Sequence, residues 1–170
     1  AQTCQINSQL RTPNAQRPTP KRLTSECYSR RMLPPDLEIS TDPARIDVDV
    51  VYRFLSTSYW AETRPREVVE RSIANSIPFG AYTAGRQVAF ARVVTDRAVF
   101  AYLADVFVVP GFRGMGISKA LMRAILSHPD LGGVTMILLR TRDAHGLYAQ
   151  FGFEPLANPD ETMAPRRHRI

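Results

Sequence analysis

Cysteine is scarce in this 170-residue sequence. Its two cysteines, Cys4 and Cys27, both lie within the first 31 residues. The remainder of the chain therefore cannot carry a disulfide framework or a CxxC metal site, and we assign no residue as a metal ligand. The remainder also has no thiol that could serve as a covalent nucleophile, so a mechanism through a cysteine intermediate is excluded there.

Long apolar runs are also missing. No stretch approaches the roughly 20 apolar residues that a helix needs to cross a bilayer. The N-terminus has no continuous apolar segment of signal-peptide length. We therefore expect a soluble, cytoplasmic protein with no membrane partner. The first methionine is Met32, which leaves open whether residues 1–31 belong to the native chain.

Positive charge is concentrated at the two ends of the chain. The formal net charge is +6. Residues 1–31 contain six Lys or Arg and one Glu, and the last five residues, RRHRI, contain three Arg. The part between them has 13 Lys or Arg against 15 Asp or Glu. A nucleic-acid-binding domain usually carries its basic surface on the folded body, so we expect no nucleic-acid partner.

Composition divides the chain into three parts. Residues 1–35 are rich in Pro, Gln, Ser, Thr and Arg without apolar periodicity, which is typical of a disordered, basic extension. Residues 36–160 carry the apolar patterns of one folded domain, in a chain that is 44% hydrophobic. Residues 161–170 form a basic tail.

The folded part alternates between helical and strand patterns. Apolar spacing at i, i+3, i+4 and i+7 predicts one helix that begins at Val48 and another over 116–127. Pro65 suits the first turn of a helix over 65–75. A short helix over 143–151 is predicted to begin at Asp143 as N-cap and to end before Gly152.

Six strands are predicted between these helices, at 37–41, 77–83, 87–95, 98–109, 134–141 and 153–156. Tight turns at 85–86 and 96–97 favour an antiparallel meander of the second to fourth strands. The fold class is therefore α/β or α+β, with a mixed, mostly antiparallel central sheet flanked by helices.

A basic, glycine-rich bend joins the strand at 98–109 to the following helix, in the segment DVFVVPGFRGMGIS (105–118). Successive backbone N–H groups at a helix start bind anions, and glycine lets a phosphate approach the backbone. A Walker A loop is excluded, because Ile117 stands where that motif needs lysine. A Rossmann fingerprint fits weakly, because Lys119 replaces its third glycine and the preceding strands are predicted to be antiparallel.

Within this bend, RGMGIS (113–118) resembles the Q/R-x-x-G-x-G/A signature of the Gcn5-related N-acetyltransferase (GNAT) superfamily. The resemblance spans roughly residues 37–157, and it includes VFVVP before the bend and LYAQFGF (147–153) near the end of the fold. Two residues depart from the family pattern. Ser118 stands where the signature has Gly or Ala, and Asp143 stands where many members carry Asn.

The resemblance implies an N-acetyltransferase that uses acetyl-CoA and has the GNAT fold. It assigns the backbone of the central strand to the thioester carbonyl, at Val106, Phe107 and Val108. It assigns the bend and the helix start to the diphosphate, at Arg113, Gly114, Met115, Gly116, Ile117, Ser118 and Lys119. It further assigns Asp143, which stands where many members carry Asn, to the cofactor arm.

The resemblance assigns one catalytic role, and the residues themselves point to a second. Tyr148 is the predicted general acid, which protonates the leaving thiolate; a phenol has an unperturbed pKa of about 10 and a thiol of about 8.5. Asp105 is the predicted general base, because a carboxylate is rarely buried within an apolar strand unless it has a partner or a function. The alternatives are that Asp105 is neutralised by Arg92 or Arg140, and that His145 or water accepts the proton.

We expect the acceptor to be the primary amine of a small molecule. It should lie against residues 59–67, where Tyr59 and Trp60 offer flat walls. Two other functions remain open: acetylation of a protein N-terminus or lysine, and a degenerate GNAT fold that binds CoA as a sensor or partner module. The sequence identifies neither the acceptor nor the acyl chain, and it leaves open whether the chain forms a homodimer, as is common in the family.

Overall fold

The computed structural model describes residues 32–164, and its centre is a five-stranded sheet in the order β1-β2-β3-β4-β5. The first four strands pair antiparallel, and β4 and β5 pair parallel. The strands are β1 Glu38–Ser40, β2 Ile77–Thr83, β3 Arg86–Thr95, β4 Phe100–Val108 and β5 Met136–Leu139. The predicted mixed, mostly antiparallel sheet is therefore confirmed.

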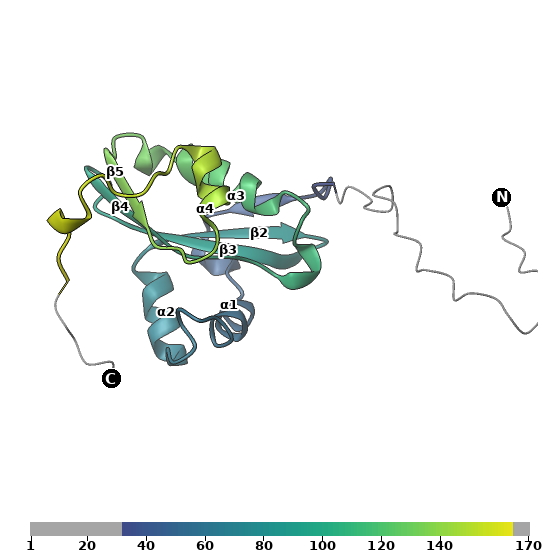
Figure 1. Ribbon diagram of the computed structural model, residues 1–170. Helices are drawn as coiled ribbons and strands as arrows, with labels where there is room; N and C mark the ends of the chain where they lie inside the picture. The colour runs from purple at the N-terminus through teal and green to yellow at the C-terminus, as the bar shows by residue number, and fades with distance from the viewer. Residues whose placement is uncertain (1–31, 165–170) are drawn as a thin grey trace, which may run out of the picture. The chain divides into compact units, whose positions relative to one another are not determined.

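Helices cover both faces of this sheet. They are α1 Val48–Leu55, α2 Arg66–Ala74, α3 Ile117–Leu126 and α4 His145–Tyr148. Figure 1 shows α1 and α2 on one face of the sheet and α3 and α4 on the other. No helix among residues 32–164 is both long enough and apolar enough to cross a membrane.

Two tight turns produce the meander. Ala84 and Gly85, between β2 and β3, have φ values of 48° and 70°, the left-handed geometry of the turn that matches strand twist. Between β3 and β4, the Asp96 carboxylate accepts hydrogen bonds from the N–H groups of Phe100, Ala98 and Val99, and these hold the pKa of Asp96 below its ordinary value. The predicted meander is confirmed, but its first turn lies at 84–85 rather than 85–86, and the second connection spans 96–99 rather than 96–97.

One hydrophobic cluster lies between the sheet and helices α1 and α2. The Asp47 side chain accepts from the Val50 N–H and so caps α1. Val51 and Leu55 are fully buried on the predicted face of that helix. Phe54 stacks on Phe107 of β4, with ring centroids 3.9 Å apart. This cluster fixes the position of α1 against the middle of β4.

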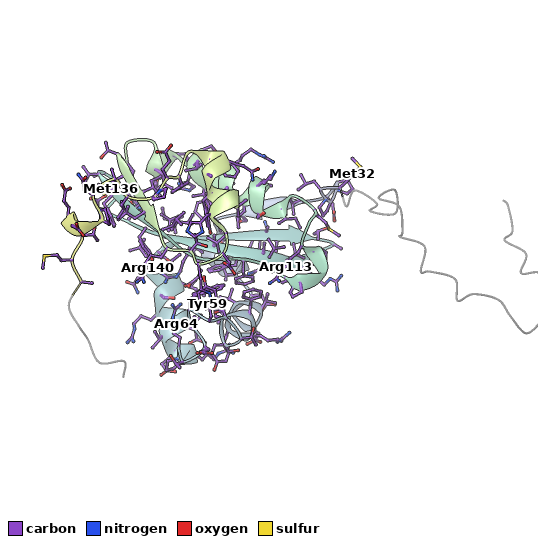
Figure 2. The ribbon with its side chains drawn as sticks, in the orientation of Figure 1. Met32, Tyr59, Arg64, Arg113, Met136 and Arg140 are labelled. Carbon is purple, nitrogen blue, oxygen red and sulfur yellow. The ribbon has the colours of Figure 1, made fainter. Side chains whose placement is uncertain are left out.

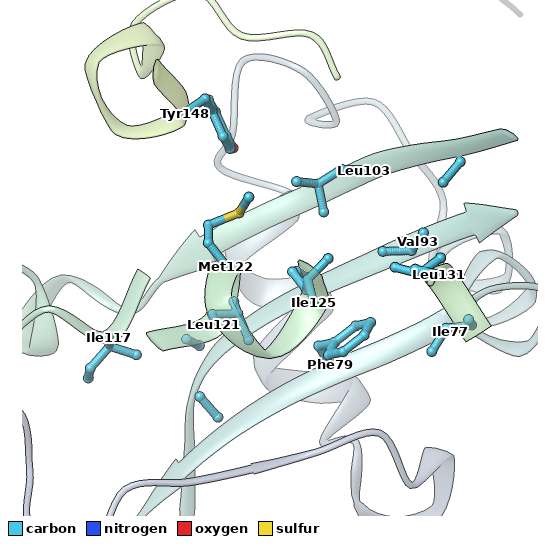
Figure 3. Packing of buried hydrophobic residues seen from close by; sticks show 14 of the residues in the cluster. Ile77, Phe79, Val93, Leu103, Ile117, Leu121, Met122, Ile125, Leu131 and Tyr148 are labelled. Atoms are coloured by element: carbon cyan, nitrogen blue, oxygen red, sulfur yellow. The ribbon is translucent and has the colours of Figure 1, made fainter. Parts of the chain in front are cut away.

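The second cluster lies under α3 and α4. Ile117, Leu121, Met122 and Ile125 of α3 are buried against β2, β3 and β4. Tyr148 of α4 joins the same cluster (Figure 3). Met122 had no place in the periodicity of the sequence, but it is fully buried, so the apolar face of α3 is wider than predicted.

Three local predictions are wrong. The predicted helix over 143–151 is shorter: α4 spans His145–Tyr148, and a 3-10 turn continues over Ala149–Phe151. Asp143 is not its N-cap, because Ala144 occupies that position and no side chain caps the helix. Residues 153–156 form no strand. Pro155 lacks a backbone N–H and cannot take part in a ladder as a donor.

Parts of the predicted domain division lie outside the described residues. These are positions 1–31 of the basic extension and positions 165–170 of the basic tail. The boundary predicted at residue 36 falls within a turn, since the Leu37 N–H bonds to the Pro34 carbonyl. Asp36 anchors this turn to the β2–β3 hairpin by accepting from the Thr83 hydroxyl and the Ala84 N–H.

Leu121→Ala tests the packing of α3. Leu121 is fully buried, so its truncation should lower the free energy of unfolding by about 2–5 kcal/mol. The exposed Arg123 on the same helix supplies the control, and Arg123→Ala should change that free energy by less than about 0.5 kcal/mol. Urea unfolding measures both, and equal losses in the two variants would contradict this packing.

Candidate active site

β4 and β5 separate at the centre of the molecule. They pair only from Phe100 and Met136 to Leu103 and Leu139. The register of β4 against β3 shifts at the same place, since Arg92 pairs with Ala104 but Phe90 pairs with Phe107. Two residues of β4 therefore oppose one residue of β3, which is a β-bulge.

Asp105 occupies this bulge with φ at 53°. A left-handed backbone is uncommon for a residue other than glycine, and such strain concentrates at functional sites. The bulge turns the second half of β4 away from the line of β5. A gap therefore opens between the two strands beyond Leu103, at the position where the sequence prediction placed the splayed central strand.

The backbone beyond the bulge faces this gap. The Val109 N–H bonds to the Val88 carbonyl of β3 at 2.9 Å. Backbone groups alternate along a strand, so those of Val108, and of Val106 two residues before it, face away from β3. The side chain of Phe107 is buried against α1, so its contribution is structural. The structure thus brings the predicted backbone donors of residues 106 and 108 to the gap.

A cavity of about 520 Å³ lies at the gap. β4 supplies one wall, the segment after β5 supplies a second, and the link between α1 and α2 supplies a third. Its lining includes two of the predicted catalytic residues, Tyr148 and Asp105. The other lining residues are Tyr59, Trp60, Arg64, Arg92, Tyr102, Leu103, Ala104, Val106, Arg140, Thr141, Arg142, Asp143 and Ala144.

Tyr148 enters this cavity from α4. The residue is only 8% exposed, and in Figure 3 its ring points from α4 toward β4 beside Leu103 and Met122. Burial, followed by the nearby Tyr59 and Asp143, raises the pKa of Tyr148 to about 12. The phenol is therefore protonated at neutral pH, which is the form that a general acid needs.

Asp105 is fully engaged by its neighbours. Its Oδ2 accepts from the Arg92 Nε at 2.6 Å and from the Arg64 Nη1 at 2.8 Å, and its Oδ1 accepts from the Trp60 indole at 3.2 Å. The Asp105 side chain is 3% exposed. The alternative that an arginine neutralises this carboxylate is thus what the structure shows, with Arg92 as predicted and with Arg64 in place of Arg140.

The remaining candidates near α4 differ in their positions. Asp143 is exposed and lines the cavity. His145, the second candidate base, is exposed on α4 and is not part of the cavity wall. The Arg142 guanidinium lies 3.6 Å from the ring centroid of Tyr59, and the Arg142 N–H donates to the Tyr59 hydroxyl at 3.2 Å. This contact closes the cavity between the α1–α2 link and the segment after β5.

The glycine-rich bend leads from β4 into α3. Gly114 and Gly116 have φ values of 78° and 82°, a backbone geometry that glycine adopts without strain. Gly116 directly precedes α3 and provides no side-chain cap, so no side chain at this position accepts a hydrogen bond from the first N–H groups of that helix. Such a start attracts an anion. The side chain of Ile117 is fully buried, which leaves only its backbone for a ligand.

Four further predicted residues of the bend take different positions. Met115 packs on the core, and Lys119 is exposed on the first turn of α3. The Arg113 Nε donates to the Val108 carbonyl at 3.1 Å, and its guanidinium carbon lies 5.8 Å from the Phe54 ring centroid. Arg113 is thus held on the side of α1. Ser118 lies in the first turn of α3 and is half-buried.

A second cavity, of about 720 Å³, lies between α1, the start of β3 and the bend. It shares Tyr59, Trp60, Arg142 and Asp143 with the first cavity, so the two are neighbours. Gln87 in its wall is buried; its Oε1 accepts from the Asp47 N–H, and its Nε2 has no hydrogen-bond partner. Sequence reasoning missed this cavity, because it joins segments that are far apart in the chain.

The comparisons with known proteins agree with this geometry. A family model for the acetyltransferase (GNAT) domain matches residues 74–155. A Gibberella zeae protein, named provisionally as an acetyltransferase, is 31% identical over 65% of this chain and 75% of its own length. A Xanthomonas campestris protein of known crystal structure, assigned to the GNAT family, is 48% identical, with a TM-score of 0.76 over 79% of this chain and 95% of that chain.

A more distant structure shares the fold alone. It is a Clostridium acetobutylicum protein assigned as an acetyltransferase and crystallised with acetyl-CoA, and it is 16% identical to this chain. Its TM-score is 0.58, over 76% of this chain and 96% of that chain. Together with the separated strands, the glycine bend and the buried tyrosine, the family model and the closer relatives show that this chain belongs to the GNAT family of acetyltransferases.

Proposed function

We propose that this protein transfers the acetyl group of acetyl-CoA to the primary amine of a small molecule by direct attack. One observation carries the proposal. A protonated, buried tyrosine faces a cavity at the point where β4 and β5 separate. Family membership supplies the acetyl-transfer class, and the size of the cavity suits a small acceptor.

The residues present fit acetyl-CoA. The left-handed glycines at 114 and 116 expose backbone N–H groups at the start of α3, which suits a diphosphate. The backbone groups of Val106 and Val108 would hold the pantetheine arm and the thioester carbonyl. The Clostridium acetobutylicum neighbour was crystallised with the same molecule. Acetyl-CoA, when bound, supplies an activated acyl thioester.

Tyr148 would hold the proton that the departing thiolate needs. Since burial raises the pKa of Tyr148 to about 12, its hydroxyl keeps that proton throughout the physiological range. A thiolate has a lower proton affinity than this phenolate, so proton transfer from Tyr148 to sulfur is uphill, and the hydroxyl would first stabilise the charge that builds on sulfur by donating a hydrogen bond to it. The hydroxyl would therefore act at the moment when the C–S bond breaks.

The predicted base role of Asp105 meets an obstacle in its contacts. Both carboxylate oxygens already accept hydrogen bonds, and Arg64 and Arg92 both contact Oδ2. We propose that Asp105 instead positions these two arginines and Trp60 around the cavity. Water within the cavity then becomes the favoured acceptor of the amine proton, since His145 lies outside the cavity wall.

Tyr148→Phe should lower kcat at least tenfold, because it removes the proton donor but keeps the ring that packs on the core. The dissociation constant for CoA should change little. In the wild-type enzyme, ionisation of the Tyr148 hydroxyl should not reduce kcat below pH 10, because the pKa of Tyr148 is raised to about 12. Thiol release measures the rates. Tyr52→Phe on α1, outside both cavities, is the matched control, and equal rates in the two variants would exclude the acid role.

Asp105→Asn separates the two roles of that residue. A base role predicts that the acidic limb of the rate–pH profile becomes flat. The ion pairs lead us to expect that the limb keeps its shape, and that the free energy of unfolding falls by roughly 3 kcal/mol because two part-buried guanidinium groups lose their counter-charge. A flattened limb in a variant of unchanged stability would restore the base role.

Gly116→Ala tests the bend. A Cβ at φ 82° strains the backbone by about 1–2 kcal/mol and so displaces the N–H groups that we propose bind the diphosphate; the dissociation constant for acetyl-CoA should therefore rise about tenfold or more. Gly85→Ala, at φ 70° in the β2–β3 turn, introduces the same strain away from the bend. Calorimetry should show no change in acetyl-CoA binding for Gly85→Ala, and equal losses in both variants would show that only strain matters.

A further inference from the structure

Positive charge exceeds negative charge in the wall of the 520 Å³ cavity. Four arginines line it, Arg64, Arg92, Arg140 and Arg142, against two carboxylates, Asp105 and Asp143. Asp105 pairs with Arg64 and Arg92 only. The neighbouring cavity adds Arg53, Arg86 and Arg113 and no further carboxylate. An approaching ligand therefore meets a basic surface.

Arg140 and Arg142 carry the excess positive charge of the cavity wall. Within residues 32–164, neither guanidinium lies within ion-pair distance of a carboxylate. Arg140 follows β5 directly and is exposed, and Arg142 is held against the Tyr59 ring. In Figure 2, Arg140, Tyr59 and Arg64 lie in the space between the sheet and helices α1 and α2, where they line the same cavity.

A simple amine is a poor match for such a wall. A free primary amine has a pKa of about 10.4 and arrives at neutral pH as a cation, which the arginines repel. We infer that the acceptor of the proposed acetyl transfer also carries an anionic oxygen group, a carboxylate or a phosphate, which Arg140 and Arg142 bind. Arginine suits both groups, because its planar fork donates two parallel hydrogen bonds. This inference rests on the proposed function.

The same charges help the amine to react. Nearby cations favour the neutral form of an amine and so lower its pKa. An acceptor that is held through its anionic group would place its amine beside Tyr148 in a positive environment. Deprotonation then needs no strong base, which agrees with the engagement of both oxygens of Asp105.

The phosphates of CoA are the other source of the same chemistry. The position of Arg140 favours the acceptor, because Arg140 lines the cavity of Tyr148 and Asp105 and not the neighbouring one. Arg142 lines both cavities, and the second one includes Phe112 and Arg113 of the bend. Binding of CoA and of dephospho-CoA to the variants below distinguishes the two sources.

The experiment compares matched amines on the full chain with acetyl-CoA. O-phosphoethanolamine is set against ethanolamine, tyrosine against tyramine, and spermidine serves as a purely cationic probe. Thiol release should give kcat/KM values at least about tenfold higher for the anionic member of a pair. Equal or higher values for tyramine, ethanolamine or spermidine would overturn the inference and leave the proposed function intact.

Two variants locate the anion. Arg140→Gln and Arg142→Gln should each lower kcat/KM for the anionic acceptor about tenfold, mainly through KM, and should leave spermidine unaffected or improved. The exposed Arg123 of α3 lines neither cavity, so Arg123→Gln is the control. Arg140→Gln keeps the test valid if Arg142→Gln disturbs Tyr59. If the variants bind CoA more weakly than the wild type does but bind dephospho-CoA equally well, the arginines bind a phosphate of CoA, and the inference is overturned.

A binding measurement separates failure of the inference from failure of the proposed function. If no amine is acetylated, the proposed function fails, and calorimetry with O-phosphoethanolamine or tyrosine on the CoA-saturated protein decides the site. Binding by the wild type that is lost in both arginine variants would support the anion site. No binding of either probe would overturn it.

Discussion

The β-bulge at Asp105 is the constraint on which the site depends. It shifts the register of β4 against β3 and ends the pairing of β4 with β5 after Leu103. The backbone of residues 106 and 108 is thereby left facing the gap. The bulge is held by side chains from two directions, Arg92 of β3 and Arg64 from the α1–α2 link. The gap between β4 and β5 and part of the cavity wall therefore both depend on the Asp105 carboxylate.

Much of the fold could be predicted because it depends on local patterns. The helical spacing at Val48–Leu55 and the turn residues predicted at 85–86 and 96–97 report on contacts within a few positions, and each observed turn lies within two residues of its prediction. The RGMGIS segment and Tyr148 could be singled out by their resemblance to the family, whose model matches residues 74–155. The structure adds the depth of burial, which makes the phenol a weak acid.

Other features depend on contacts between distant parts of the chain. The partner of Asp105 at residue 64 is 41 positions away, so no spacing rule identifies it. Residues 153–156 form no strand, because strand pairing depends on tertiary packing and because Pro155 has no backbone N–H to donate. Arg140 and Arg142 follow the edge strand as ordinary charged residues in the sequence, and only the folded cavity gathers them with Arg64 and Arg92.

Tyr148 is buried in the same hydrophobic cluster as Met122 and Leu103, whereas Tyr59, Trp60, Arg140 and Arg142 stand in solvent-accessible positions. Exposed positions tolerate substitution with stability changes of less than about 0.5 kcal/mol, but buried ones do not. If these residues act as proposed, substitutions that change the acceptor cost little stability, whereas the Tyr148 ring cannot be removed without a loss of core packing. Under that proposal, the acceptor can change while the transfer reaction stays the same.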